Sequence, residues 1–183
     1  MRYQFRLTKY NPELREPNGA YMLDEWTSYS DVGRSFAGVT LCEEEYLRVE
    51  SAYLTSLASF LAESGIASLR IAGLEDYGTG ALPPFVEAGR DLNLGECVAF
   101  SKLALRERVW AKLVRPGVAY IHFGYDFYVY LGLPRLCPAA LQHAHDAGLF
   151  AEAIRSPYLR ARPNLSLEPT RVGKPPLAAQ LQR

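Results

Sequence analysis

An apolar stripe at helical spacing between residues 41 and 64 is the strongest structural signal in the chain. Its members recur every three or four positions and are Tyr46, Val49, Tyr53, Leu57, Phe60 and Leu61. This spacing predicts one long amphipathic helix, which begins beside a capping box formed by Thr40 and Glu43 and ends at Gly65. A helix of this kind must bury its stripe, so the remaining chain has to supply a hydrophobic surface.

Strand patterns on both sides of this helix indicate what that surface is. Residues 2–9 place Tyr3, Phe5 and Leu7 on one side and predict a half-buried strand. Further strands are predicted at residues 21–26, 67–74, 109–114, 118–123, 127–132 and 149–154, and shorter helices at 93–106 and 138–148. Because three of these strands follow one another through tight turns, we predict an α+β fold, a mostly antiparallel sheet with two or three helices packed on one face.

Two local signals refine this pattern. Asn93 and Glu96 form a second capping pair at the start of the helix predicted for residues 93–106. Between the strand at 67–74 and this helix, residues 75–92 predict a long loop that contains Gly78, Gly80 and two prolines.

The length and composition indicate one globular domain, which we assign to residues 1–158 of the 183-residue chain. No stretch resembles a membrane-spanning helix, and the first residues lack the apolar core of a signal peptide. The cysteines are scattered at Cys42, Cys97 and Cys137, which fits neither a disulfide framework nor a metal knuckle. We therefore expect a cytoplasmic protein with no cofactor, no metal and no membrane association.

Residues 159–183 lose all periodicity and predict a non-globular, disordered tail. This segment has no aromatic residue, so it cannot bury enough apolar surface to order itself. It holds five basic residues and one acid, a net charge of +4, and because the whole chain sums to zero, residues 1–158 carry −4. An acidic body argues against a nucleic-acid partner and is compatible with a basic protein partner.

The tail also resembles a known kind of peptide, and the stretch SLEPTRVGKPPLAAQLQR carries this resemblance. It is similar to the product of a reading frame that runs into the recombination site closing an integron gene cassette. The resemblance covers about one-tenth of the chain and implies a mobile bacterial gene, not an activity. Cassettes of this kind often encode resistance factors, antitoxins or immunity-like proteins, so this context favours a toxin-like protein partner.

The body resembles a group of uncharacterised bacterial proteins of similar size. The segments that carry this second resemblance are RYQFRLTKYNPELREPNGAYMLDEWTSYSDVGRSF and YIHFGYDFYVYLGLP. The group has no known function to transfer, so this resemblance implies no functional residue.

The first candidate site lies in the hairpin between residues 119 and 131. A three-residue loop at 124–126, with Gly124 or Asp126 in the left-handed conformation, would pair Phe123 with Phe127 and His122 with Tyr128. One face of the hairpin would then carry Tyr120, His122, Tyr128 and Tyr130. Tyrosines around a histidine are typical of a binding face and also of the half-exposed side of a sheet. Catalysis would need a partner for His122, and Asp126 is the carboxylate nearest in sequence.

The second candidate site is a polar segment made of Asp24, Glu25, Trp26, Asp31 and Arg34. Paired carboxylates in such a segment could act as a general acid and base. The same residue types also build turns that hydrogen-bond themselves, so both interpretations stay open. His143 and His145 are two positions apart on a predicted helix and point to different faces, which makes them a poor metal pair.

We therefore expect a non-enzymatic protein-binding factor of the immunity or antitoxin type that acts by occluding its partner. One alternative is a small enzyme with acid/base chemistry shared among Asp24, Glu25, Asp31 and His122. Another is a small-molecule-binding module that uses the hairpin face and the loop at 75–92 as a lid. The sequence carries no signal for the oligomeric state.

Truncation of the chain after Tyr158 tests the predicted tail. Because the removed residues should bury no core, the melting temperature of the shortened protein should stay within about 1 °C of the full-length value. Calorimetry of both proteins measures this shift. A loss of more than ~5 °C would mean that the tail packs on the body.

Overall fold

Seven strands form one antiparallel sheet in the computed structural model, which describes residues 1–17, 21–78 and 80–159. Their order across the sheet is β5-β4-β6-β7-β8-β1-β9, so the first strand of the chain lies between two of the last. The strands are β1 (Tyr3–Thr8), β4 (Ser68–Asp76), β5 (Asp91–Asn93), β6 (Val109–Arg115), β7 (Ala119–Phe123), β8 (Val129–Leu133) and β9 (Phe150–Glu152). This topology confirms the predicted, mostly antiparallel α+β fold.

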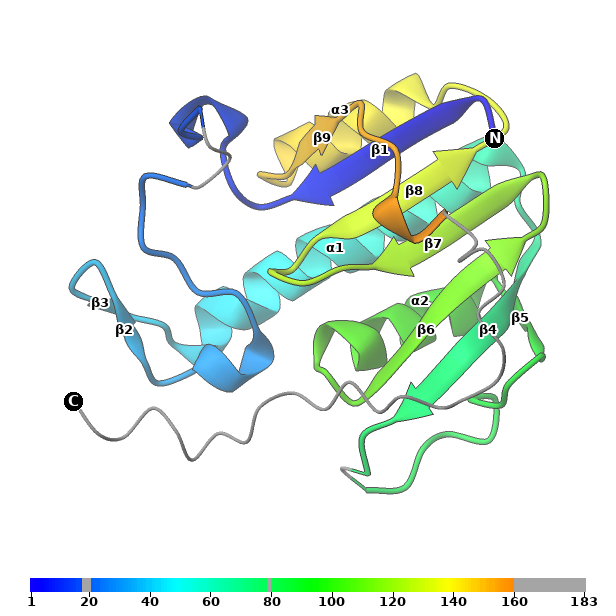
Figure 1. Cartoon of the computed structure of the whole chain (residues 1–183), viewed down its shortest axis with the longest axis horizontal. Coiled ribbons are helices and arrows are strands. Elements are labelled where there is room, and N and C mark those ends of the chain that lie inside the picture. Colours follow the sequence, from blue (N-terminus) through cyan, green and yellow to red (C-terminus); the bar gives the residue numbers. More distant parts are fainter. Residues whose placement is uncertain (18–20, 79, 160–183) are drawn as a thin grey trace.

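Three α-helices of the described ranges cover one face of this sheet (Figure 1). They are α1 (Glu43–Ser64), α2 (Leu94–Leu105) and α3 (Pro138–Asp146), and α1 packs against both of the others. The smaller elements are η1 (Pro12–Leu14), η2 (Tyr29–Asp31), β2 (Ser35–Phe36), β3 (Val39–Thr40) and η3 (Pro157–Leu159). None of the described helices combines the length and apolarity needed to cross a membrane. Apart from Leu159 in η3, the predicted tail lies outside the described residues.

The predicted long helix is α1, and its apolar stripe faces the sheet. The fully buried side chains of this stripe include Tyr46, Tyr53, Leu57 and Phe60. The helix ends at Gly65, as predicted, and this glycine has a left-handed conformation with φ at 72°. The predicted capping box is wrong: the residue at the N-cap is Cys42. Thr40 instead belongs to β3, where its hydroxyl lies 2.9 Å from that of Ser35.

Polar contacts at the ends of α2 fix this helix in place. The Asn93 side chain accepts the backbone N–H of Glu96 at 3.0 Å, and the Glu96 carboxylate accepts the backbone N–H of Asn93 at 3.0 Å. The capping pair predicted here is therefore confirmed. At the other end, Arg106 Nη2 donates to the carboxylate of Glu50 on α1 at 2.7 Å. Glu50 is only 3% exposed, so loss of Arg106 would leave a buried charge without its partner.

An aromatic cluster joins α1 to two loops at one end of the sheet, and it consists of Trp26, Tyr46, Tyr53 and Phe127. The ring of Phe127 stands edge-on to the other three, with centroids 5.2 Å from Trp26, 5.7 Å from Tyr46 and 5.2 Å from Tyr53. Edge-on contacts of this kind contribute ~0.5–1.5 kcal/mol each beyond the area they bury. The cluster therefore ties the N-terminal loop and the β7–β8 turn to the helix layer.

Several short segments differ from the prediction. Residues 21–26 do not form a strand: Tyr21 makes one isolated bridge to Arg15, and Trp26 turns into the core. The loop predicted at 75–92 is shorter, because β4 continues to Asp76 and β5 begins at Asp91. The β2–β3 hairpin was not predicted at all. Strands of two or three residues contain too little alternation to be recognised from sequence.

Replacing Tyr53 or Phe60 by Ala tests the assigned core face of α1. Both side chains are fully buried, so each change should lower the free energy of unfolding by about 3–5 kcal/mol. Leu47→Ala on the same helix is the matched control, because Leu47 is 39% exposed and its loss should cost under ~1 kcal/mol. Urea unfolding measures all three. Costs below ~1 kcal/mol for both core variants would mean that the stripe does not support the sheet.

Candidate functional site

The sheet face opposite the helices carries a row of polar side chains across five strands. In register, these are Lys112 on β6, His122 on β7, Tyr130 on β8, Arg6 on β1 and Glu152 on β9. Arg6 donates to Glu152 at 2.7 Å, and Arg15 from the following loop donates to the same carboxylate at 2.9 Å. Burial alone would raise the pKa of Glu152, but the hydrogen bonds from Arg15 and Arg6 hold it below its ordinary value.

The turn between β7 and β8 is displaced by one residue from the predicted one. The N–H of Gly124 donates to the carbonyl of Tyr128 at 2.8 Å, so the three-residue loop is 125–127 and not 124–126. His122 consequently pairs with Tyr130, and the predicted pairs of His122 with Tyr128 and of Phe123 with Phe127 are wrong. Each partner moves by two positions, and because side chains alternate with a period of two, the tyrosines and the histidine still share one face. The physical reason is that Phe127 enters the aromatic cluster and cannot begin the strand.

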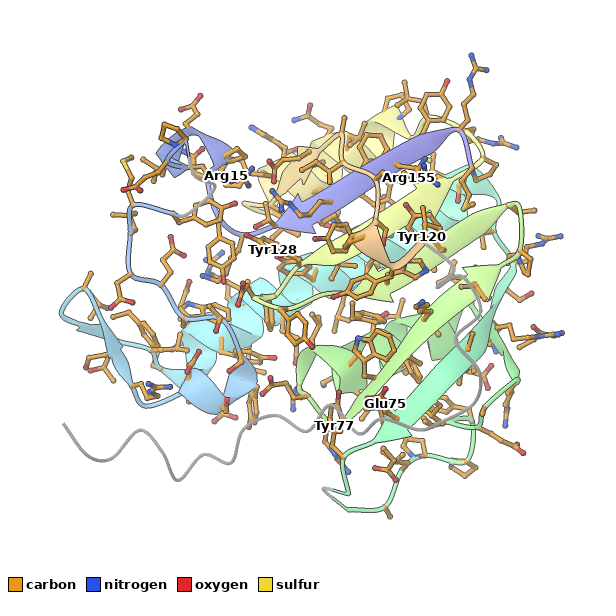
Figure 2. All side chains as sticks on the ribbon, viewed as in Figure 1. Arg15, Glu75, Tyr77, Tyr120, Tyr128 and Arg155 are labelled. Carbon is orange, nitrogen blue, oxygen red and sulfur yellow. The ribbon has the colours of Figure 1, made fainter. Side chains whose placement is uncertain are left out.

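Tyr120 lies across a glycine on the neighbouring strand. A Cβ atom at Gly132 would lie 2.1 Å from the Tyr120 ring, so this ring position requires glycine on β8. The Tyr120 hydroxyl donates to the Gln4 side chain on β1 at 2.9 Å, and its ring stacks on His122 with centroids 4.3 Å apart. Figure 2 shows Arg155, from the segment after β9, beside Tyr120 on the same side of the sheet. Tyr120 is thus a packed part of the sheet.

The segment after β9 crosses this face and covers it (Figure 1). In this covering segment, residues 153–159, the Ser156 hydroxyl lies 2.8 Å from His122 Nδ1. Lys112 Nζ also donates to the carbonyl of Tyr158 at 3.1 Å. His122 is 2% exposed as a result. The face that the sequence singled out for binding is therefore largely closed by the chain itself.

The His122–Ser156 pair has the composition of a catalytic dyad without its electrostatics. Burial, and then the nearby Lys112 ammonium group, lower the pKa of His122 from 6.5 to about 4. A general base works best when its pKa lies near the operating pH, so this imidazole is a weak base. The Ser156 hydroxyl also accepts the backbone N–H of Tyr158 at 3.2 Å and is itself only 2% exposed. The hydrogen bond between His122 and Ser156 therefore holds the covering segment on β7.

The second predicted site is centred on Asp31, whose carboxylate mainly organises its own loop. One of its oxygens accepts the backbone N–H groups of Thr27 and Ser28 at 2.9 and 3.1 Å. The other accepts a hydrogen bond from Arg34 at 2.7 Å. Asp31 is 5% exposed, so these donors replace the water that its charge would otherwise require. The geometry is that of a self-bonded turn.

The remaining members of that site have other partners. Glu25 accepts a hydrogen bond from Lys9 at 2.6 Å, and Trp26 belongs to the aromatic cluster. Asp24 and Asp126 are exposed, on different loops. The structure therefore does not join the predicted carboxylates to His122 in one hydrogen-bonded arrangement.

The most exposed tyrosines lie at the end of the sheet where β4 ends and β7 turns into β8. Tyr125 is 81% exposed and Tyr77 is 51% exposed. The Tyr77 N–H donates to the carbonyl of Arg108 at 3.2 Å, which places Tyr77 beside Glu107. Burial raises the pKa of Tyr77, and Glu75, Tyr125 and Glu107 raise it further. Figure 2 shows Glu75 and Tyr77 together at the end of β4. With Glu107, Tyr125 and Asp126, they form a surface that we call the acidic tyrosine patch.

The turn that carries Tyr125 is held in one conformation by its neighbours. Asp126 and Phe127 both have left-handed backbones, with φ at 56° and 61°, which residues with side chains rarely adopt. Phe127 is 5% exposed and fixed in the aromatic cluster, which maintains this conformation. Tyr125 falls within the loop predicted at residues 124–126 and was not among the predicted site residues. Its position between two turn-forming residues, Gly124 and Asp126, was the signal that it would be exposed.

Comparison with known proteins identifies no family for this chain. No protein-family model, curated protein or solved structure matches the chain. Within the described ranges, no group of three or more His, Cys, Asp or Glu side chains is arranged to hold a metal ion. The candidate site is therefore argued from its own contacts and exposure.

The buried His122 predicts a specific pH dependence of stability. The unfolded chain takes up a proton on this residue below pH ~6.5 while the folded chain does not until about pH 4, since its pKa is about 4. Above pH ~6.5 both states are neutral at this site, so the free energy of unfolding should fall only as the pH drops through that window, by ~3 kcal/mol in total. His122→Gln should remove this loss, whereas His143→Gln on the exposed side of α3 should keep the wild-type profile. Identical pH profiles for wild type and His122→Gln in urea unfolding would contradict the assignment.

Proposed function

We propose that this chain is a non-enzymatic protein-binding factor of the immunity or antitoxin type, encoded on a mobile gene cassette. It acts by covering the working surface of a basic partner protein with the acidic tyrosine patch. The observation that carries this proposal is the exposure of Tyr125 on a turn whose backbone is fixed by a buried neighbour.

The Tyr125 ring has the properties of a binding hot spot. Tyrosine offers a large apolar surface with a polar tip and few rotatable bonds, and it is enriched among the residues that dominate interface energies. A turn already held in its bound conformation loses little entropy when a partner arrives. Tyr77 lies nearby and is also more than half exposed, so a partner could contact both rings at once.

The charges of the molecule support a basic partner. The patch and the strand ends beside it carry the carboxylates of Glu75, Asp76, Glu107 and Asp126, against the cation of Arg108, whose carbonyl accepts the N–H of Tyr77. An excess of carboxylates at the patch attracts an approaching basic protein and speeds association.

The alternative of an acid/base enzyme has less support. Its best base, His122, has a pKa of about 4 and is closed off by the covering segment. Of the carboxylates assigned to it, Glu25 is engaged by Lys9 and Asp31 by its own loop. By contrast, the exposed tyrosine patch needs no rearrangement to meet a protein surface.

The test starts from the reading frame adjacent to this gene in its native cassette array. If the neighbouring product arrests growth, co-expression of this chain should restore growth and the two proteins should form a complex. Tyr125→Ala should weaken that complex by ~2 kcal/mol, about 30-fold in Kd measured by titration calorimetry. The melting temperature of the Tyr125→Ala protein should equal that of the wild type, because the exposed Tyr125 ring does not stabilise the core.

Leu136→Ala is the matched control for this experiment. It also removes an exposed apolar side chain, 45% exposed, but from the opposite end of the sheet, and it should leave the Kd unchanged. Higher salt should slow association of the wild-type pair because the patch is acidic. Wild-type affinity of the Tyr125→Ala protein, or equal losses in both variants, would rule out the patch as the contact surface.

A further inference from the structure

A cavity of about 140 Å³ lies between the loop after β1, the first half of α1 and the turn that joins α3 to β9. Its apolar wall is formed by Trp26, Val49, Ala52, Leu149 and neighbouring Ala147. The volume is about that of an engineered protein cavity that accepts benzene. A molecule of roughly this size could therefore bind here without unfolding the surrounding elements.

Lys9 places an ammonium group in the wall of this cavity. Its side chain is only 6% exposed, and its Nζ lies 4.1 Å from the centroid of the Tyr10 ring and 4.2 Å from that of Trp26. Glu25 accepts a hydrogen bond from it at 2.6 Å. An ammonium group has three N–H donors, so this one can also donate to the oxygen of a ligand. Burial lowers the pKa of Lys9 in spite of its hydrogen bond to Glu25.

A second ion pair lines the same cavity on the α1 side. Arg48 donates two hydrogen bonds to Glu45, at 2.7 and 2.8 Å, and 60% of the Arg48 side chain is exposed. The cavity is thus lined by two cations and two carboxylates beside an apolar wall. A simple anion or a simple cation would meet like charge as well as opposite charge in this setting. A small molecule that carries both charges would match both pairs.

We propose that this cavity binds a small zwitterion, an α-amino acid with a branched aliphatic side chain of about the size of valine. The amino-acid carboxylate accepts from Lys9 and Arg48, and its ammonium group donates to Glu25 and Glu45. The aliphatic side chain packs on Val49, Ala52 and Leu149. This site is separate from the acidic tyrosine patch and does not depend on the proposed function.

Titration calorimetry of the full chain with L-valine and its two truncated analogues tests this proposal without any mutation. The analogue 3-methylbutanoate lacks the ammonium group, and 2-methylpropylamine lacks the carboxylate. Each should bind at least ~10-fold more weakly than valine, because the first lacks the charge that meets Glu25 and Glu45 and the second lacks the charge that meets Lys9 and Arg48. Equal binding of valine and 3-methylbutanoate would overturn the zwitterion assignment. Absence of binding by valine and leucine at 10 mM, roughly the weakest range that calorimetry detects, would overturn the site itself.

Binding measurements on variants then test whether valine binds in this cavity. Lys9→Met keeps the length of the side chain but removes its charge and should weaken valine binding by ~10-fold or more. Arg70→Gln is the control, because Arg70 forms an exposed ion pair with Asp91 on a distant edge of the sheet, and it should bind valine like the wild type. Circular dichroism checks that each variant is folded. Should Lys9→Met not fold, Glu25→Gln provides the same comparison from the other member of the pair, and unchanged affinity in a folded variant would refute the proposal.

Discussion

The contact on which most of this structure depends is the insertion of Phe127 among Trp26, Tyr46 and Tyr53. It fixes the β7–β8 turn on the helix layer and thereby holds Tyr125 outward. Through Trp26 it also positions one wall of the Lys9 cavity. A single aromatic anchor thus determines the geometry of both candidate surfaces, and it does so at the cost of two left-handed residues that packing must stabilise.

Periodicity allowed much of the fold to be predicted. The stripe of α1, the capping pair at Asn93 and the consecutive strands before residue 133 are local patterns, and the structure contains all of them. The capping box at Thr40 failed because a cross-strand partner, Ser35, competes for that residue. The hairpin register failed for a related reason, since Phe127 is buried by Trp26, a residue about a hundred positions earlier. Such long-range contacts leave no trace in a local pattern.

The candidate sites illustrate the same division between local and distant information. The sequence correctly separated the tyrosines and His122 from the aliphatic side chains of the hairpin. It could not reveal that residues 153–159 lie across them, because nothing in Ser156 or Tyr158 marks a contact with β7. Because this face is largely buried, its side chains pack within the fold and are not exposed for binding a partner. The exposed tyrosines are instead Tyr125 and Tyr77, which lie in segments predicted to be loops.

The position of β1 between β8 and β9 has a consequence for how a cell makes this protein. β1 is synthesised before the other strands of the sheet, yet both of its neighbours, β8 and β9, are the last two strands to be synthesised. Throughout translation its two edges and the apolar side chains of Phe5 and Leu7 lack their final partners. Sheets that depend on such distant pairings form slowly, and until they form they expose apolar side chains and unpaired strand edges that favour aggregation. We therefore expect chaperones to bind the nascent chain until the covering segment has been synthesised.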